Sequence, residues 1–350
     1  MLMSREDMRY TVCNARKVIS GHFLTKKDCW LHPHILDFIK NRNPTVVLDP
    51  FAGEGDMLRA VQELTGCQIK GLDIQGELWP KNDSLLSIPP VQNGMIVTNP
   101  PYLANHSAKR KGVLEQVEGY YRKSGRDDLY QVALDRCLAS CAQVVAIVPE
   151  TLLNSGYDLR HAVHVTVLHE NPFSDTETPV CVVCFDRSSE YDTEIFSDHQ
   201  KAMTLSRLNS FRLYPKKSTQ IRFNVPSGRV GLRAVDMPSP DKPIEFMPRA
   251  NLDYHVAGIK VSSRLLTFIE IPQLKDDEIS MLCKMANEIF SAYRKNTLGF
   301  SLSPFKGNNK AGSRRRRLDY STARAILEQA IERKTRVTGC PFAQQQILFA

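Results

Sequence analysis

Residues 99–102 (Asn-Pro-Pro-Tyr) combine residue types that would bind and activate a planar amino group. The tandem prolines Pro100 and Pro101 fix φ and remove two N–H donors, and they drive the residues before them into extended conformations. We therefore expect a rigid loop that presents carbonyl oxygens, with the side-chain oxygen of Asn99 beside them, as acceptors for an –NH2 group. The ring of Tyr102 offers a face for stacking a planar ring. A rigid turn without a function is the alternative interpretation.

Residues 49–56 (DPFAGEGD) form a second motif between an apolar strand-like run and a helical pattern. Small residues at Ala52, Gly53 and Gly55 would let the backbone turn tightly and approach a ligand, and the following helix N-terminus would supply free N–H groups. The three acidic residues of the motif would repel a diphosphate but suit a cation such as a sulfonium. The motif therefore favours S-adenosylmethionine over a dinucleotide, with an ordinary strand–turn–helix as the alternative.

Two further acidic residues lie where a doubly wound sheet commonly binds its ligand. Asp73, in the segment GLDI, comes 24 residues after Asp49 and would accept hydrogen bonds from ribose hydroxyls. Asp83, in the segment NDSLL, is expected on the loop after a short third strand. Its carboxylate would accept from the exocyclic amino group of the cofactor's adenine. A solvated acid at a strand end is the alternative for Asp73.

The elements expected to position these motifs alternate between strand-like and helical patterns over roughly the first 190 residues. Four apolar runs are nearly continuous, as expected for parallel strands covered on both faces, and they lie at 45–49, 68–73, 95–99 and 144–148. Two more strand-like runs lie at 163–168 and 180–185, and helical patterns lie at 57–64 and 129–141. This alternation predicts an α/β fold with an open, doubly wound, mostly parallel sheet.

The second half of the chain has a different composition, rich in Ser, Pro and Arg. Its pieces are strand-like at 220–225 and 229–235, helical at 276–293 and 320–336, and flexible at 296–313. Because 350 residues exceed one average domain, we expect two domains. We place their bounds at 1–190 and 191–350, with the second as a binding region.

The net charge of +8 is concentrated near the C-terminus, where residues 301–350 hold ten basic and three acidic residues. This asymmetry indicates a polyanionic partner. The run Arg314–Arg317 would contact phosphates without reading sequence, or would form a solvated face or a localisation signal. The basic, glycine-containing segment 106–126 would form a mobile loop that clamps phosphates, or a plain surface loop. The phosphate-contact candidates are Lys109, Arg110, Lys111, Arg314, Arg315, Arg316 and Arg317.

Composition excludes several classes of protein. A charged fraction of 24% and an aromatic fraction of 8% indicate a folded chain. No apolar run approaches the ~20 residues of a membrane span, and the polar N-terminus lacks the apolar part of a secretory signal, so we expect a cytoplasmic protein. The nine cysteines are scattered and expected to be reduced. Cys181 and Cys184 lie in a strand-like run that would point their thiols to opposite faces, so no metal is expected.

In order and spacing, the segments DPFAGEGD, GLDI, NDSLL and TNPPY resemble those of the amino-methyltransferases that modify exocyclic amines of nucleic-acid bases. They are most similar to the adenine DNA methyltransferases of restriction–modification systems and phages. The cofactor motif first, NPPY next and a long C-terminal region last resemble the gamma class. The resemblance implies a Rossmann-like methyltransferase domain at 1–190, a target-recognition region at 191–350, and a bacterial or phage source. It also implies a monomer and, as a candidate partner, a separate restriction endonuclease.

The resemblance also implies roles for individual residues. Residues 21–25 (GHFLT) resemble the family's N-terminal segment GxFxT, although Lys26 replaces the usual proline. Phe173, twelve residues before Phe185, would stack on a flipped-out base, or else be a core aromatic. The implied cofactor contacts are Thr25, Asp49, Phe51, Ala52, Gly53, Gly55, Asp73, Ile74 and Asp83. The implied catalytic residues are Asn99, Pro100, Pro101 and Tyr102, with Tyr102 and Phe173 stacking on the base.

The implied reaction moves a methyl group from S-adenosylmethionine to the 6-amino group of adenine in DNA. Asn99 and the carbonyl of Pro100 would accept the two amine hydrogens and stabilise the charge that develops on nitrogen. The base must first be flipped out of the duplex. Alternatives are an RNA adenine methyltransferase, a protein glutamine methyltransferase, or a non-catalytic nucleic-acid-binding protein built on a decayed methyltransferase fold. The glutamine enzymes usually carry an N-terminal helical domain, for which the ~45 residues before the first strand leave little room.

Overall fold

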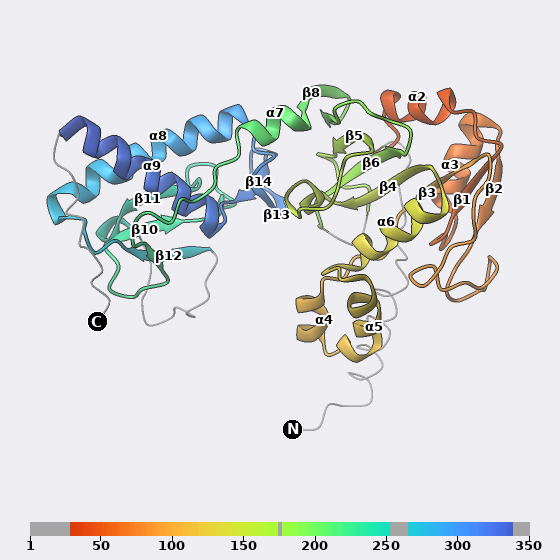
Figure 1. Cartoon of the computed structure of the whole chain (residues 1–350), viewed down its shortest axis with the longest axis horizontal. Helices are drawn as coiled ribbons and strands as arrows, with labels where there is room; N and C mark the ends of the chain where they lie inside the picture. The colour runs from red at the N-terminus through yellow and green to blue at the C-terminus, as the bar shows by residue number, and fades with distance from the viewer. Residues whose placement is uncertain (1–28, 174–176, 253–264, 339–350) are drawn as a thin grey trace. The chain divides into compact units, whose positions relative to one another are not determined.

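The computed structural model describes residues 29–173, 177–252 and 265–338 of the chain (Figure 1). Thr25 and the whole GHFLT segment lie outside the described residues. The chain divides into two compact units, Met1–Ser206 and Arg207–Ala350. Each unit has its own sheet and its own buried core, and each is described by itself.

The first unit is built on one eight-stranded sheet with the order β2-β1-β3-β4-β6-β5-β7-β8. Neighbours among β1, β2, β3 and β4 are parallel, as are β5 and β7, whereas β6 is antiparallel to β4 and β5, and β8 to β7. The strands are β1 (Val46–Asp49), β2 (Gln68–Gly71), β3 (Gly94–Thr98), β4 (Gln143–Pro149), β5 (Ala162–Val167), β6 (Val180–Asp186), β7 (Glu194–Ser197) and β8 (Gln200–Thr204).

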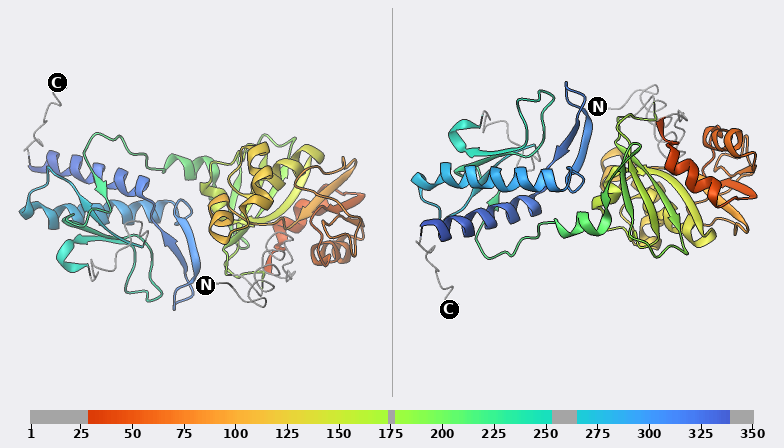
Figure 2. Two further views of the ribbon diagram at one scale, coloured as in Figure 1. Left: turned by 90° about the horizontal axis from the view of Figure 1, so that it is seen from below. Right: turned by 90° about the horizontal axis from the view of Figure 1, so that it is seen from above.

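Helices cover both faces of this sheet (Figure 2). On one face, α2 (Pro33–Asn41) and α3 (Asp56–Thr65) share an apolar core with alternate strand residues such as Val47 and Met95. On the opposite face, the helix α6 (Leu129–Ser140) packs against β4. The hydroxyl of Ser140, at the end of this helix, donates a hydrogen bond to the Pro89 carbonyl. Burial of nearly every residue of β4 and β6 follows from this double cover. The predicted α/β class and the doubly wound, mostly parallel sheet are confirmed.

Two expectations about the first unit are corrected. The six predicted strands form within one or two residues of their expected bounds, but no third strand forms between β2 and β3, where the described chain shows only an isolated bridge between Asp73 and Lys81. The unit also ends at Ser206 rather than near residue 190. The reason is that β7 pairs with β5 and β8 pairs with β7, so both strands extend the same sheet.

The segment 106–126 is a helical hairpin rather than a mobile loop. Its helices are α4 (Asn105–Lys111) and α5 (Leu114–Ser124), and each ends at a glycine with positive φ, Gly112 at 70° and Gly125 at 69°. The hairpin is ordered because it buries apolar side chains among other parts of the unit. Those residues are Ala108, Val113, Val117 and Tyr121, which pack with Leu85, Leu103 and Leu129.

The second unit has a four-stranded antiparallel sheet of order β11-β10-β12-β9. Its helices α8 and α9 pack on one face, in a core with Val230, Leu232 and Phe246. The strands are β9 (Arg222–Phe223), β10 (Val230–Arg233), β11 (Glu245–Pro248), β12 (Leu266–Glu270) and the separate pair β13 (Ser303–Asn308) and β14 (Arg314–Arg317). The helices are α7 (Leu205–Ser210), which begins at the end of the first unit, α8 (Ile279–Asn296) and α9 (Tyr320–Thr338), with short 3-10 turns at Arg249–Asn251 and Asp276–Glu278. The 3-10 turn at Glu150–Asn154 belongs to the first unit.

The segment expected to be flexible at 296–313 contains β13 instead, which pairs with β14. A buried carboxylate explains why this hairpin is fixed. Asp236 accepts two hydrogen bonds of 2.8 Å from Arg294 and one of 3.0 Å from the backbone N–H of Arg316 in β14. Among the helices that the structure describes, none is long and apolar enough to cross a membrane.

Candidate active site

The glycine-containing motif and the NPPY motif meet through Asp49, the last residue of β1. Its Oδ1 accepts a hydrogen bond of 2.9 Å from the backbone N–H of Phe51 and one of 2.6 Å from the hydroxyl of Thr98, the last residue of β3. Burial raises the pKa of Asp49 to about 7, although these hydrogen bonds oppose the shift. The parallel pairing of β1 and β3 thus places both motifs at one edge of the sheet.

The glycine loop turns where left-handed backbone is required. Gly53 has φ 49° and Gly55 has φ 81°, a region that favours glycine. The indole Nε1–H of Trp79 donates a 3.0 Å hydrogen bond to the Gly53 carbonyl, and a Cβ placed on Gly55 would lie 2.8 Å from the Trp79 ring. Sequence reasoning missed Trp79, because nothing in the local pattern shows that its side chain folds back on this loop.

Asp73, the residue predicted to bind the cofactor's ribose, lies beside the same loop. It is buried, and its Oδ2 accepts from the backbone N–H of Gly53 at 3.2 Å while its Oδ1 accepts from that of Gln75 at 2.8 Å. The neighbouring Ile74 is 36% exposed and presents an apolar side chain. Both residues follow β2, which is parallel to β1, so they lie at the same edge of the sheet as Asp49.

The structure also brings Asp83 to this edge. The backbone N–H of Asn82 donates a 2.9 Å hydrogen bond to the carbonyl of Asp73. One oxygen of Asp83 accepts from the backbone N–H of Leu85 at 3.2 Å, and the other accepts from the hydroxyl of Tyr120 at 2.8 Å. Burial first, and then the hydrogen bond to Asp83, raise the pKa of Tyr120 to about 12.

The NPPY loop holds a buried acceptor next to an aromatic pair. The hydroxyl of Tyr102 lies in hydrogen-bond contact with the side-chain oxygen of Asn99 and 2.8 Å from the carbonyl of Ile147. Asn99 is 6% exposed, and burial raises the pKa of Tyr102 well above its usual value. The ring of Tyr102 lies 6.4 Å from that of Phe173, with an interplanar angle of 59°. The two aromatics expected to flank a base are therefore neighbours.

The end of the NPPY loop is fastened to the start of α6. Asp128 accepts a 3.1 Å hydrogen bond from the backbone N–H of Leu103, and the hydroxyl of Tyr121 donates a 2.7 Å bond to the Leu103 carbonyl. Burial raises the pKa of Asp128 to about 6. Sequence reasoning did not identify Asp128 or Tyr121, since both act through contacts with a loop more than 17 residues away.

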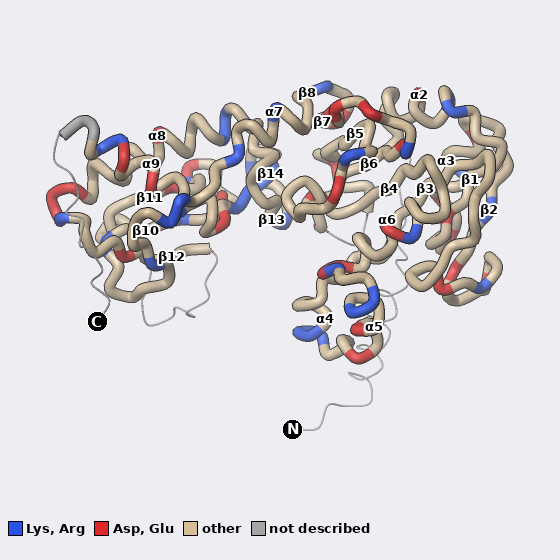
Figure 3. The backbone as a smooth tube through the Cα atoms, viewed as in Figure 1, with Lys and Arg blue, Asp and Glu red and all other residues tan. Residues whose placement is uncertain are grey.

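The phosphate-contact candidates fall into two groups (Figure 3). The side chains of Lys109, Arg110 and Lys111 are exposed in the last turn of α4. The run Arg314–Arg317 is not an exposed basic face, because strand alternation turns Arg316 inward to 5% exposure. The guanidinium of Arg315 donates to the Asp236 carbonyl at 2.7 Å and lies 4.8 Å from the centre of the Phe305 ring. Surface contact with a phosphate therefore does not fit Arg316.

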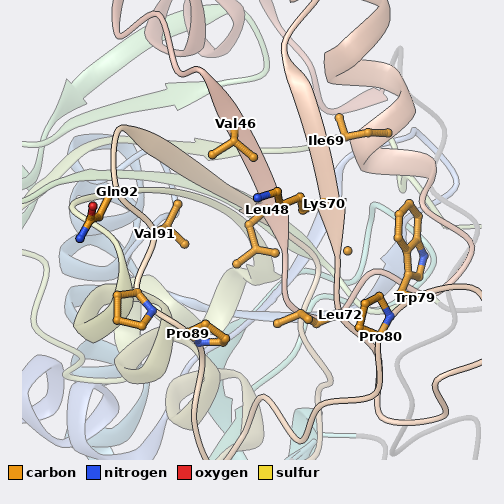
Figure 4. Close-up of a pocket in the computed structure, with 12 residues that line it drawn as sticks. Val46, Leu48, Ile69, Lys70, Leu72, Trp79, Pro80, Pro89, Val91 and Gln92 are labelled. Carbon is orange, nitrogen blue, oxygen red and sulfur yellow. The ribbon is translucent and has the colours of Figure 1, made fainter.

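A cavity of about 470 Å³ lies against β1 and β2 and reaches the carboxyl end of β2, where Leu72, Trp79 and Pro80 line it (Figure 4). Val46, the first residue of β1, lines it together with Leu48 and the proline pair Pro89 and Pro90. Because Trp79 also donates to the Gly53 carbonyl, the cavity adjoins the glycine loop of the candidate cofactor site. Among the described residues, no group of three or more His, Cys, Asp or Glu side chains has a metal-binding arrangement.

No family model and no curated protein matches the sequence. Three solved structures show weak similarity. The modification subunit assigned to a type I restriction enzyme of Vibrio vulnificus YJ016 is 18% identical, with 56% of this chain and 53% of that chain covered and a TM-score of 0.36. The type I restriction-modification methyltransferase subunit of Streptococcus thermophilus is 13% identical, with 51% of each chain covered and a TM-score of 0.34.

The third structure is the M protein of the type I restriction enzyme EcoKI, at 12% identity, with 76% of this chain and 70% of that chain covered and a TM-score of 0.31. The alignments span about half the length of the first two proteins. Similarities at this level do not define the fold, which rests on the sheet and helices of the chain itself.

Proposed function

We propose that the chain is an S-adenosylmethionine-dependent methyltransferase that modifies an exocyclic amino group of a nucleic-acid base, with adenine N6 in DNA as the acceptor. The observation that carries the proposal is the buried Asn99 acceptor at the end of β3. It lies next to the Tyr102–Phe173 pair and is tied to the glycine loop through Thr98 and Asp49.

The residues at the carboxyl ends of β1 and β2 fit this cofactor. Asp73 would accept hydrogen bonds from the ribose hydroxyls, and Asp83 from the adenine amino group. Ile74 would contact the adenine ring, because its partly exposed apolar side chain directly follows Asp73. The glycine loop and Asp49 would hold the methionyl part, and a cationic ligand would favour the ionised form of Asp49. The bound cofactor supplies an electrophilic methyl group on a positively charged sulfur.

On the acceptor side, the loop would bind an –NH2 group through two oxygens. The Asn99 side-chain oxygen and the Pro100 carbonyl would accept the two hydrogens, which localises the nitrogen lone pair for in-line attack. The same acceptors stabilise the positive charge that develops on nitrogen. The Asn99 side-chain oxygen has two lone pairs, so it can accept from the substrate as well as from the Tyr102 hydroxyl.

A base in a duplex reaches this loop only when it is flipped out. Stacking would recover about 1–3 kcal/mol per base, provided that the rings of Tyr102 and Phe173 turn from their 59° angle toward parallel planes. The exposed cations of α4 support a polyanionic substrate. The motif resemblance supports DNA. A monomer, a partner endonuclease and a bacterial or phage cytoplasm remain predictions of that resemblance.

A methyl-transfer assay with four acceptors tests the proposed substrate class. The whole protein is incubated with tritiated S-adenosylmethionine and duplex DNA, single-stranded DNA, RNA or a glutamine-containing protein. We expect tritium in DNA. Label confined to RNA would replace the DNA assignment with the RNA alternative, and label confined to protein would contradict a nucleic-acid substrate. No label in any acceptor, despite cofactor binding, would contradict catalysis.

A further inference from the structure

One hydrogen bond joins the inserted helical hairpin to the cofactor side of the candidate site. The hydroxyl of Tyr120, in α5, donates to Oδ2 of Asp83 at 2.8 Å, while Oδ1 of Asp83 accepts from the backbone N–H of Leu85 at 3.2 Å. A carboxylate held at both oxygens has a fixed orientation. Each oxygen can still accept a hydrogen bond from a further donor. Tyr120 therefore orients the Asp83 carboxylate without using all of its acceptor capacity.

Asp83 is linked in turn to the glycine loop. The backbone N–H of Asn82 bonds to the Asp73 carbonyl at 2.9 Å, and the side chain of Asp73 accepts from the backbone N–H of Gly53 at 3.2 Å. A short series of hydrogen bonds therefore runs from α5 through both acids to the loop after β1.

Apolar packing fixes the same relationship. Val117 and Tyr121 of α5 share one buried cluster with Leu85, next to Asp83, and with Leu103, after the NPPY loop. Phe51 of the glycine loop packs against this cluster. The hairpin thus packs with residues of the glycine loop and of the NDSLL segment and with the residue that follows NPPY.

The hairpin carries both basic and acidic residues (Figure 3), and its exposed cations outnumber the exposed acids Glu115 and Glu118. Its exposed cations are Lys109, Arg110 and Lys111 in the last turn of α4 and Arg122 and Lys123 in the last turn of α5. The hairpin therefore carries one residue that orients a cofactor-side carboxylate and five that suit a phosphate backbone. Any shift of α5 that follows ligand binding at Asp83 moves these cations as well.

We infer that Tyr120 is a positioning residue that couples cofactor binding to nucleic-acid binding. This inference rests on the proposed function. When a ligand donates to Asp83, the carboxylate and the Tyr120 hydroxyl adjust together, and the hairpin settles in the placement that its cations need. Coupling of this kind is reciprocal, so bound nucleic acid raises the affinity for the cofactor by the same factor.

The test measures the coupling factor directly. The affinity of the whole protein for labelled duplex DNA is determined by fluorescence anisotropy with and without saturating S-adenosylhomocysteine. We expect the ligand to tighten DNA binding by about fivefold or more in the unmodified protein. In Tyr120→Phe, the factor should fall toward one, while DNA affinity without ligand stays the same. The matched control is Tyr191→Phe, which removes a hydroxyl from a side chain that is 84% exposed in the same unit.

A second variant shows whether the effect passes through Asp83. S-adenosylhomocysteine affinity without DNA is measured for Tyr120→Phe, Asp83→Asn and the double variant. If Tyr120 acts by orienting Asp83, removing its hydroxyl weakens the ligand when Asp83 is present and has little further effect in Asp83→Asn. A packing role alone would give additive losses. Thermal melting of each variant verifies that it folds.

The outcomes separate the inference from the proposed function. An unchanged coupling factor in Tyr120→Phe, or no coupling in the unmodified protein, overturns the inference while cofactor binding and methyl transfer remain. Failure of the unmodified protein to bind S-adenosylhomocysteine overturns the proposed function itself, and the inference with it.

Discussion

The hydroxyl of Thr98 at the end of β3 donates a 2.6 Å hydrogen bond to Oδ1 of Asp49 at the end of β1. Both side chains are buried, with exposures of 0% and 3%. This bond joins two motifs that are 49 residues apart in the sequence. The glycine loop and the NPPY loop consequently share one support, so a change at this position affects both the cofactor side and the acceptor side.

Replacing Thr98 with valine should destabilise the first unit. The substitution keeps the shape of the side chain but leaves a buried carboxylate oxygen without one donor, which costs about 1–3 kcal/mol. Urea unfolding followed by tryptophan fluorescence measures the change, since both tryptophans, Trp30 and Trp79, lie in this unit. Thr45→Val is the control, because it removes a 2.7 Å bond from an exposed hydroxyl to the Asn93 carbonyl. An equal loss of unfolding free energy in Thr98→Val and Thr45→Val would contradict the view that burial makes the Thr98 hydrogen bond important.

The raised pKa of Asp49 predicts a specific pH dependence of stability. The folded pKa is about 7 against an ordinary value of 3.8, so between these two pH values the folded state holds a proton that the unfolded state has lost. The Asp49 contribution to the free energy of unfolding should therefore fall as pH rises from about 4 to about 7, and then remain constant. Between pH 5 and pH 8, the free energy of unfolding should decline less steeply in Asp49→Asn than in the unmodified protein. If the unfolding free energies of the unmodified protein and Asp49→Asn change with pH in parallel, the raised pKa of Asp49 is contradicted.

The glycine loop predicts a contrast between two glycine-to-alanine variants. Gly55 and Gly66 have similar φ angles, +81° and +70°, so alanine should strain the backbone by about 1–2 kcal/mol at either position. Only at Gly55 does the new methyl group meet the Trp79 ring, at 2.8 Å, whereas at Gly66 nothing lies within 4 Å. Isothermal titration with S-adenosylhomocysteine should show weakened binding for Gly55→Ala alone. Equal binding by both variants would argue against this loop as the cofactor site.

The exposed cations of α4 predict the salt dependence of DNA binding. Each lost phosphate contact should reduce the slope of log affinity against log salt by about 0.9 for duplex DNA. The double variant Lys109→Ala/Lys111→Ala should therefore lower the slope by up to about twice the value for one contact. The control Lys40→Ala/Lys70→Ala removes the same charge from exposed lysines elsewhere in the unit. An identical slope for the two double variants would place the DNA on another surface.

The sequence predicted those parts of the molecule that depend on local pattern. Nearly continuous apolar runs identified the strands β1 to β4, and two further strand-like runs identified β5 and β6. The residue types around Gly53 and Asn99 identified the loops that follow β1 and β3. Parallel strands end at one edge of a sheet, so the loops after β1 and β3 are neighbours, as the Thr98–Asp49 bond shows.

The remaining features depend on contacts between residues far apart in the chain. The basic, glycine-containing segment 106–126 indicated a loop, yet burial of Val117 and Tyr121 makes it a helical hairpin. Four consecutive arginines indicated a basic face, but strand alternation and Asp236 hold Arg316 inside. Local residue types carry no information about such distant partners, so the roles of Trp79 and Tyr120 were also not predicted.

The central claim is that Asn99 activates the amino group of adenine in DNA. Its most direct test is mass analysis of nucleosides from unmethylated duplex DNA incubated with S-adenosylmethionine and the protein, Asn99→Ala, or the exposed-residue control Asn41→Ala. The account predicts N6-methyladenine with the protein and the control, and a rate about 10²–10³-fold lower with Asn99→Ala, by analogy with the loss of one oxyanion-hole donor. N6-methyladenine formed at an undiminished rate by Asn99→Ala, or a different methylated nucleoside, would contradict it.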